Sequence, residues 1–302
     1  MANKPPRNID ELRKLYAEII KSGRQKHFGL ISLRIFRYML DSPAEVAVKS
    51  ISQIANEHGT NSSTVTRLAQ RLGFLGFSDY QQIFRDYVRE GASFYSTQVK
   101  NFLESSTSRS NSADSILQQV IHEEWGNVMA TLDQFDKRKF KNVVSLILKA
   151  NRISILGLRS VFTLAFYFEY YFKLISGNIR ILGGSGHTLA EDLAHLGEGD
   201  LLLAISVKPY TKNTIIACQE AKRQGAELVT ITDSYSSPIA IETKNSLIVS
   251  SKGPYFFTPL VSLVIYMEAL LSELVKSLGD KAIDKLKRTE ELFERMNIET
   301  EG

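Results

Sequence analysis

The chain of 302 residues is poor in cysteine and in long apolar runs, and both shortages limit what it can be. Its single cysteine, Cys218, excludes a disulfide within the chain and a zinc site built on cysteine pairs. We therefore expect a reducing compartment, no metal and no cofactor. The start, MANKPPRNID, lacks the apolar core of a signal peptide, which favours a cytoplasmic protein. The longest aromatic run, residues 161–177, contains Glu169 and Lys173, so we predict a buried or subunit-facing helix there and no membrane span.

A strong net charge is also absent, but the charge is unevenly distributed. The composition is ordinary for a globular protein, with 43% hydrophobic and 23% charged residues, and the length suggests about two domains. Residues 1–90 carry 14 Lys and Arg against nine Asp and Glu, an excess larger than the +4 of the whole chain. A basic head on a slightly acidic body is typical of a nucleic-acid-binding domain joined to a domain with another task. Chance asymmetry on a solvated surface would give the same count.

Residues 51–74, ISQIANEHGTNSSTVTRLAQRLGF, predict two short helices joined by a tight turn. Apolar residues recur at helical spacing in both halves, Gly59 suits the end of the first helix, and Asn61 is a good N-cap for the second. The exposed face of the second helix would carry hydroxyls near its start and two arginines one turn apart, and such side chains contact phosphates and base edges of DNA. The residues that we expect to contact DNA are Ser62, Ser63, Thr64, Thr66, Arg67, Gln70 and Arg71.

The same pattern also fits a helical hairpin whose polar face is simply solvated. The flanking segments favour a DNA-binding helix-turn-helix. An amphipathic helix is expected at residues 30–40, and another at 79–88, capped by Ser78 and bearing Arg85 and Arg89. A small helical domain with the turn between its second and third helices is the common form of such modules.

The composition after residue 90 changes to Ser, Thr and Asn, centred on SSTSRSNSADS, which is typical of a linker. Two further helices are expected before residue 150, and the single tryptophan, Trp125, is expected to be a core or dimer contact. The domains that we expect are a helix-turn-helix domain at 1–90, a linker at 91–115, an α/β ligand-sensing domain with leading helices at 116–285, and a C-terminal helix and tail at 286–302.

Short apolar segments alternate with helical ones from residue 152 onward. This alternation predicts βαβ units and a doubly wound parallel sheet of five strands, so that the whole chain is α/β with an all-α domain in front. A long apolar helix at about 259–278 would close the sheet domain. The strands are expected at 152–157, 178–183, 200–206, 227–233 and 246–251, and the helices between them at about 160–175, 187–196, 212–224 and 236–241.

Doubly wound sheets bind their ligands at the carboxyl ends of the strands. The first predicted strand runs into Gly157-Leu158-Arg159-Ser160, and the third runs into Ser206-Val207-Lys208-Pro209-Tyr210-Thr211. Hydroxyls and cations at two adjacent strand ends, each before a helix N-terminus, suit a phosphate or a carboxylate. Either turn alone would fit ordinary capping residues. The predicted ligand-binding residues are Arg159, Ser160, Ser206, Lys208, Tyr210 and Thr211.

These features, with LAQRLGFLGFSDYQQ in the head and ITDSYSSPIA in the body, resemble the RpiR/MurR-type bacterial transcriptional regulators over about residues 30–278. The α/β half resembles an SIS (sugar isomerase) domain. The resemblance implies that the head binds operator DNA as part of a homodimer or homotetramer. It also implies that the SIS domain binds a phosphorylated sugar that alters the affinity for DNA.

The resemblance is incomplete at the ligand loop. SIS domains commonly have a Ser after the first strand, which Ser160 matches, and a Ser-x-Ser-Gly-x-Thr loop after the third. Ser206 and Thr211 match the ends of that loop, but Lys208 and Pro209 replace its second Ser and its Gly. The effector implied is therefore a small anionic metabolite, either a sugar phosphate or a sugar acid.

The alternative is an enzyme, a sugar-phosphate isomerase or lyase whose N-terminal helices serve only assembly. SIS isomerases and lyases transfer protons with Glu or His, and His187, Glu191 and His195 fall on the helix expected after the second strand. His187 and Glu191 are equally an exposed pair four residues apart. Because a DNA-binding head suits a sensor, we predict a ligand-responsive transcriptional regulator with no catalytic residue.

Overall fold

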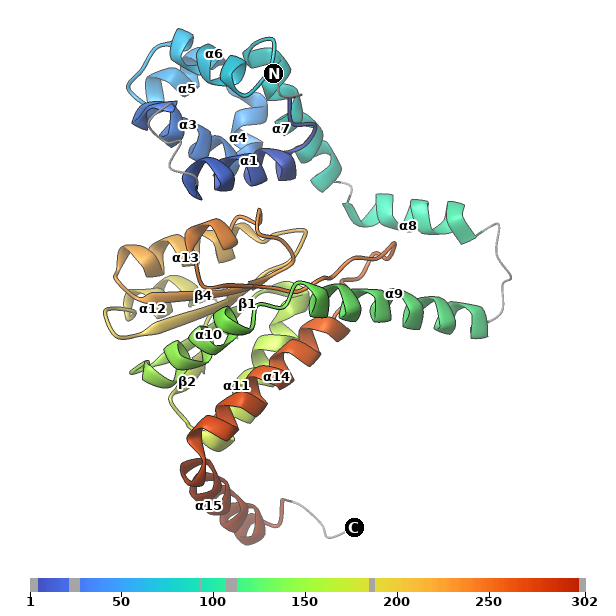
Figure 1. The fold of residues 1–302 in the computed structure, drawn as a ribbon, viewed down its shortest axis with the longest axis vertical. Coiled ribbons are helices and arrows are strands. Elements are labelled where there is room, and N and C mark those ends of the chain that lie inside the picture. The colour runs from blue at the N-terminus through green and yellow to red at the C-terminus, as the bar shows by residue number, and fades with distance from the viewer. Residues whose placement is uncertain (1–4, 22–27, 93, 107–112, 185–187, 299–302) are drawn as a thin grey trace. The chain divides into compact units, whose positions relative to one another are not determined.

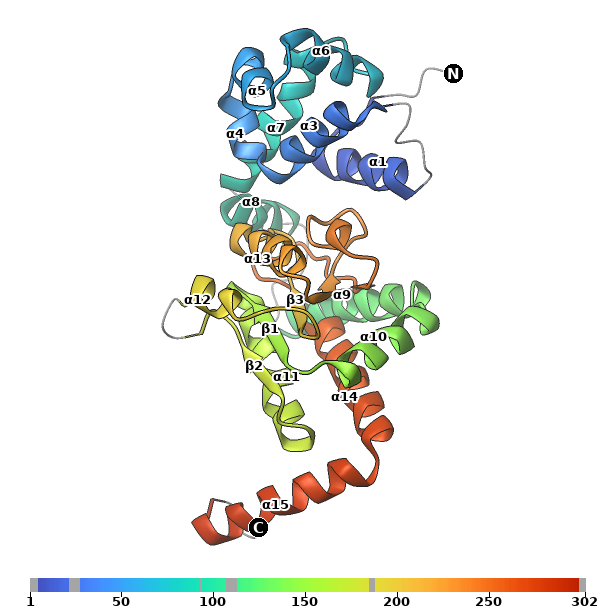
Figure 2. The same cartoon turned by 90° about the vertical axis from the view of Figure 1, so that its left-hand side faces the viewer.

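The computed structural model describes the whole chain except residues 1–4, 22–27, 93, 107–112, 185–187 and 299–302. The chain forms two compact units, a helical one and an α/β one (Figures 1 and 2). None of the helices in the described part of the chain is long and apolar enough to cross a membrane. The helical unit comprises residues 1–109, 235–241 and 254–257, and the α/β unit comprises 110–234, 242–253 and 258–302.

The helical unit has a large apolar core, to which α1 and the helices from α3 to α7 contribute. Phe36, Tyr80 and Phe84 are fully buried and contact one another edge to face, with ring centroids 6.5 and 5.1 Å apart along the series. The core therefore joins α3 to α7 across the helices between them. The helices are α1 (Ile9–Lys21), α3 (Leu30–Asp41), α4 (Pro43–Val48), α5 (Ile51–Glu57), α6 (Ser62–Arg71), α7 (Phe77–Ala92) and α8 (Phe94–Ser106).

Two features of this unit differ from the prediction. Helix α4 was not predicted, because six residues are too few to show a period, and Pro43 in its first turn is a weak mark by itself. Helix α7 begins at Phe77, so Ser78 is not its N-cap. The carboxylate of Asp79 instead accepts the N–H of Leu75 at 3.0 Å, which closes the start of the helix.

Arg85 and Gln81 on α7 hold the end of α4. The Gln81 amide donates to the carbonyls of Val46 and Lys49 at 2.7 and 2.8 Å, and Arg85 donates to that of Ala47 at 3.1 Å and to the Gln81 side-chain oxygen at 2.7 Å. Arg85 thus satisfies carbonyls that a short helix leaves open. This structural task accounts for one of the arginines that had suggested DNA contact.

The segment at 91–115, predicted as a linker, carries α8 and the first residues of α9 (Ala113–Asp133). Its Ser- and Thr-rich composition gave no sign of these helices. The domain limits drawn from the sequence therefore stay a prediction, and the structure adds helical segments within the linker range.

The α/β unit contains a five-stranded parallel sheet with the order β2-β1-β3-β4-β5, which confirms the predicted fold class. Helices α12 and α13 lie over one face and α10, α11 and α14 over the other (Figures 1 and 2). The order reverses between β1 and β3, and the carboxyl ends of such a pair are where doubly wound sheets bind ligands. The strands are β1 (Ile153–Gly157), β2 (Ile179–Ile181), β3 (Leu201–Ile205), β4 (Glu227–Thr232) and β5 (Ser246–Ile248).

The central strands β1 and β3 are buried on both faces, as expected for a parallel sheet covered by helices. Alternate residues such as Ile153 and Ile155 join Phe168 and Leu270 in the larger core. Cys218 on α13 is fully buried, and burial raises the pKa of its thiol well above the usual range. The helices of this unit are α9, α10 (Lys137–Lys149), α11 (Phe162–Ile175), α12 (Leu189–Ala194), α13 (Lys212–Arg223), α14 (Val261–Leu278) and α15 (Asp280–Met296).

One predicted helix in this unit needs correction. The helix expected at 236–241 is only a short 3₁₀ turn, Ala240–Glu242. Helix α15 begins at Asp280, because Gly279 with φ 56° ends α14 and allows the chain to turn directly into the next helix.

Candidate functional site

Helix α6 forms the candidate DNA-binding surface, and its position depends on well-capped neighbours. The Asn61 side-chain oxygen accepts the backbone N–H of Thr64 at 3.0 Å and the Ser63 hydroxyl at 2.7 Å. Gly59, with φ 62°, provides the left-handed turn after α5. The apolar side of α6 consists of Val65, Leu68 and Ala69, which are buried, so the opposite side faces outward.

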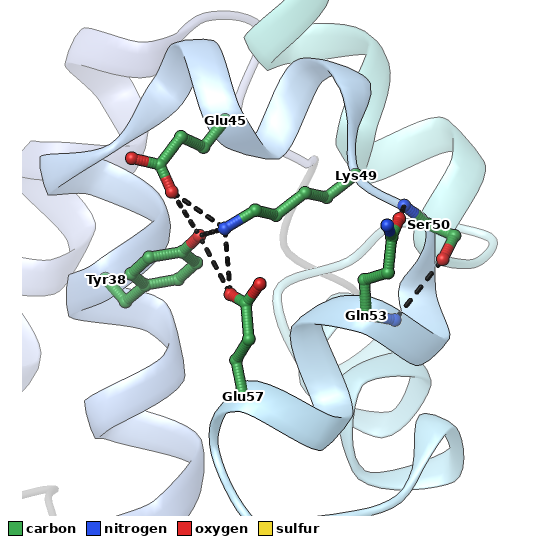
Figure 3. Close-up of polar contacts among 6 residues, drawn as sticks. All are labelled: Tyr38, Glu45, Lys49, Ser50, Gln53 and Glu57. Carbon is green, nitrogen blue, oxygen red and sulfur yellow. Dashed lines mark hydrogen bonds and ion pairs between the residues drawn. The ribbon is translucent and has the colours of Figure 1, made fainter.

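A polar cluster fixes α5 to α3 and α4 (Figure 3). The Lys49 ammonium donates to Glu45 at 2.7 Å, to Glu57 at 2.8 Å and to the Tyr38 hydroxyl at 2.9 Å. The hydrogen bonds to these two carboxylates, followed by that to Tyr38, raise the pKa of Lys49 above its ordinary value. One ammonium therefore joins side chains from three helices.

The start of α5 is closed by a reciprocal pair that Figure 3 also shows. The Gln53 N–H donates to the Ser50 hydroxyl at 3.2 Å, and the Ser50 N–H donates to the Gln53 side-chain oxygen at 2.8 Å. At the other end, Arg34 donates to the carbonyl of His58 at 2.6 Å. Hydrogen bonds thus fix both ends of α5, and Arg34 on α3 fixes the turn that leads to α6.

The seven predicted DNA-contacting residues divide into two groups. Ser63, Arg67, Gln70 and Arg71 are exposed and share one face of α6. Ser62, Thr64 and Thr66 are half-buried, and the Thr66 hydroxyl donates to the carbonyl of Ser62 at 3.0 Å.

Both arginines are steadied from nearby carbonyls. Arg67 donates to that of Ser63 at 3.3 Å, and Arg71 donates to that of Phe28 at 3.2 Å. The functional groups that these four residues expose on α6 are therefore two guanidinium groups, one amide and one hydroxyl.

The first ligand loop follows β1. Gly157 cannot carry a side chain, because a Cβ there would lie 2.5 Å from the carbonyl oxygen of Val161. Arg159 adopts φ 60°, a left-handed conformation that non-glycine residues rarely take and that occurs often at binding sites. The Ser160 hydroxyl is exposed and lies 3.4 Å from that of Thr258.

The second ligand loop follows β3 and is tied to the end of β4. Ser206 is buried and its N–H donates to the carbonyl of Ile231 at 3.1 Å, so it continues the sheet. Lys208 is exposed and precedes Pro209 by a cis peptide bond. The Tyr210 hydroxyl donates to the carboxylate of Asp233 at 2.8 Å.

The two loops leave adjacent strands at the same edge, since Gly157 at the end of β1 pairs with Ile205 at the end of β3. The predicted residues Arg159 and Ser160 follow β1, and Lys208, Tyr210 and Thr211 follow the neighbouring strand β3. Both sets therefore begin at the same edge of the sheet, and Thr211 directly precedes α13.

Sequence reasoning missed two residues at this edge, Asp233 and Thr258. Asp233 follows β4, the next strand of the sheet, so the same rule of strand ends would have found it. Burial raises the pKa of the Asp233 carboxyl, against the opposing effect of the hydrogen bond from Tyr210. Thr258 lies on the segment before α14, which the strand pattern does not reach.

Of the groups considered for proton transfer, the structure describes Glu191 and His195. His187 lies outside the described residues. Glu191 is exposed on α12, and His195 ends that helix and accepts a hydrogen bond from Arg152 at its backbone carbonyl, 2.8 Å away.

Comparison with known proteins gives a consistent result for both units. The model of the rpiR-family helix-turn-helix domain matches residues 15–90, and that of the SIS domain matches residues 146–272. A helix-turn-helix-type transcriptional regulator of Clostridium perfringens is 25% identical over 261 residues, which cover 84% of this chain and 90% of that protein.

Two solved structures have the same fold. The sugar isomerase domain of an RpiR transcription factor from Sphaerobacter thermophilus is 24% identical, with a TM-score of 0.55, and covers 57% of this chain and 97% of its own. The NanR protein of Vibrio vulnificus complexed with ManNAc-6P is 18% identical, with a TM-score of 0.52, and covers 93% of this chain and 98% of its own.

Proposed function

The chain belongs to the RpiR-type transcriptional regulators, with an rpiR-family helix-turn-helix domain and an SIS domain, and we propose that α6 reads operator DNA while the loops after β1 and β3 bind a small anionic effector. The exposed face of α6 carries the first half of this proposal. Arg67 and Gln70 can donate to base edges in the major groove, and Ser63 and Arg71 can reach phosphates.

Operator binding by two copies is part of the proposal. Two recognition helices of a symmetric dimer reach half-sites about 34 Å apart, or a multiple of it. The α/β unit offers apolar faces for such a contact: on α11, Phe166, Tyr170 and Tyr171 are exposed, and on α9 Trp125 is 63% exposed. Exposed apolar faces of this kind are typical of subunit contacts.

The effector is proposed to be a sugar acid or a sugar phosphate held between the two loops. Arg159 and Lys208 supply positive charge, and the left-handed backbone of Arg159 supports a binding role for its loop. The NanR protein was solved with a phosphosugar, ManNAc-6P, which makes that class the first to test.

The effector would act through linkage. A ligand changes the affinity for DNA only if it binds one arrangement of the dimer better than another. We propose sensing without turnover, because Glu191 is exposed on α12 and His195 ends that helix, and neither belongs to the two loops. The linker limits at 91–115 are part of the same proposal.

The decisive experiment is a fluorescence-anisotropy titration of the full chain with DNA from upstream of its own and neighbouring genes, at fixed salt and with nonspecific DNA as control. Sequence-selective binding that one compound of a sugar-phosphate and sugar-acid panel changes would support the proposal. Equal affinity for all fragments, together with isomerase activity, would favour the enzyme.

The variant Lys208→Ala tests the ligand half separately. Removing the ammonium should abolish the effect of the compound and leave DNA affinity unchanged without it. Lys212→Ala is a matched control, because Lys212 is also an exposed lysine at the start of α13 but lies outside the proposed set. A full response in Lys208→Ala would place the anion elsewhere.

A further inference from the structure

The carboxylate of Asp233 faces the hydrogen-bond donors of the loop after β3. Asp233 follows β4, which pairs with β3 through Ile231 and Ile205. The Tyr210 hydroxyl donates to one of its oxygens at 2.8 Å, and the backbone N–H of Lys208 points at the other at 3.4 Å. The Thr232 hydroxyl is 3.3 Å from the first oxygen. Donors from both sides therefore converge on Asp233.

The position of this carboxylate decides what the loop can accept. A phosphate bound by the Lys208 N–H would come into contact with the Asp233 oxygen that the same N–H faces. Both groups are anionic, and two like charges in contact within a partly dehydrated site disfavour each other. Lys208 supplies one positive charge to the loop, and the carboxylate offsets it.

We infer that Asp233 is a specificity-determining residue, which excludes phosphate from the loop after β3 and accepts hydrogen bonds from sugar hydroxyls there. An ionised carboxylate is an acceptor only, so hydroxyl donors are its natural partners. The anionic group of the effector then lies between Arg159 and Ser160 of the loop after β1 and the Lys208 ammonium, while the Lys208 backbone N–H stays with Asp233. This inference rests on the proposed function, because it assigns the two ends of the effector to the two loops.

The test is isothermal titration calorimetry of the full chain with inorganic phosphate, with no DNA present. Asp233→Asn keeps the size of the side chain and one acceptor oxygen but removes the charge. It should bind phosphate at least about tenfold more tightly than the parent protein, as expected when a contacting like charge is removed.

Glu198→Gln is the matched control, because Glu198 is an exposed carboxylate before the amino end of β3, at the opposite end of that strand from the loop. Its phosphate affinity should equal that of the parent. Thermal unfolding of each variant checks the fold, and Asp233→Ser replaces Asp233→Asn if the amide destabilises the loop.

Two results would overturn the inference. One is an Asp233→Asn protein whose phosphate affinity stays within about twofold of the parent, including the case in which neither binds, since a contacting charge should change the affinity by more. The other is an equal gain in Glu198→Gln, which would assign the effect to the net charge of the protein and not to contact with Asp233. Neither depends on DNA, so failure of the operator titration leaves this test intact, and a regulator that responds to effectors could still fail it.

Discussion

The two candidate sites of the molecule are built in opposite ways. On α6 the structural groups and the outward groups are separate: Asn61 and the buried apolar side hold the helix, while Arg67 and Gln70 point away from the core. At the loop after β3 the same side chains have a structural role and a proposed binding role, because Tyr210 and Asp233 bind each other at the place where a ligand is expected. A substitution on α6 should thus affect binding without stability, whereas a substitution at the strand ends should affect both.

The largest effect tests the strand ends at Gly157. Gly157→Ala places a methyl group against the backbone of Val161 and should destabilise the α/β unit by about 2 to 3 kcal/mol, as overpacking does. Urea unfolding followed by circular dichroism measures the change. Gly197→Ala is the control, because its added Cβ meets nothing within 4 Å. Equal stability of the two variants would show that the turn after β1 can relax and that the strand ends are no more constrained than a loop.

A smaller effect is expected when one guanidinium is removed from α6. Arg67→Ala should weaken operator binding by about tenfold, within the range for one good base contact, and leave the unfolding midpoint unchanged. Arg288→Ala removes an equally exposed arginine from α15 and should change neither quantity. The alternative outcome is that Arg67→Ala weakens binding to operator and to nonspecific DNA equally and lowers the slope of log affinity against log salt concentration by about 0.9. In that case Arg67 contacts a phosphate and not a base.

The smallest effect sharpens the division of tasks on α6. Asn61→Ala removes the N-cap and should cost about 1 kcal/mol of stability in the helical unit. Asn61→Asp keeps an acceptor oxygen at the cap and should restore stability. Measured by urea unfolding, an alanine variant as stable as the parent would mean that the hydroxyls of the next residues replace the cap.

The sequence predicted most of the fold because its signals are local. Each strand of the sheet was placed within a few residues, since short apolar runs between helical segments are typical of the buried strands of a parallel sheet. Helix α4 was too short to show a period, and the segment predicted as a linker gave no sign of α8. The candidate helix α6 was found because capping residues and an apolar stripe coincide within ten residues.

The ligand edge was predicted only in part, because its chemistry depends on pairs far apart in the chain. Tyr210 meets Asp233 across 23 positions, and Ser160 meets Thr258 across 98. No periodicity connects such residues, and only the order of the strands brings them together. Arg85 illustrates the same limit in the helical unit, since its charge suggested DNA while its contacts are the carbonyl of Ala47 and the side chain of Gln81.

The burial of Cys218 makes this protein a convenient subject for distance measurements. The only thiol of the chain is enclosed within the α/β unit, where burial raises its pKa and shields it from labelling reagents. A cysteine introduced at the exposed position of Gln70 would therefore take up a spin label or dye alone, without prior removal of native thiols. If two copies of the chain pair as proposed, the distance between their two α6 helices, with and without a candidate effector, becomes directly measurable.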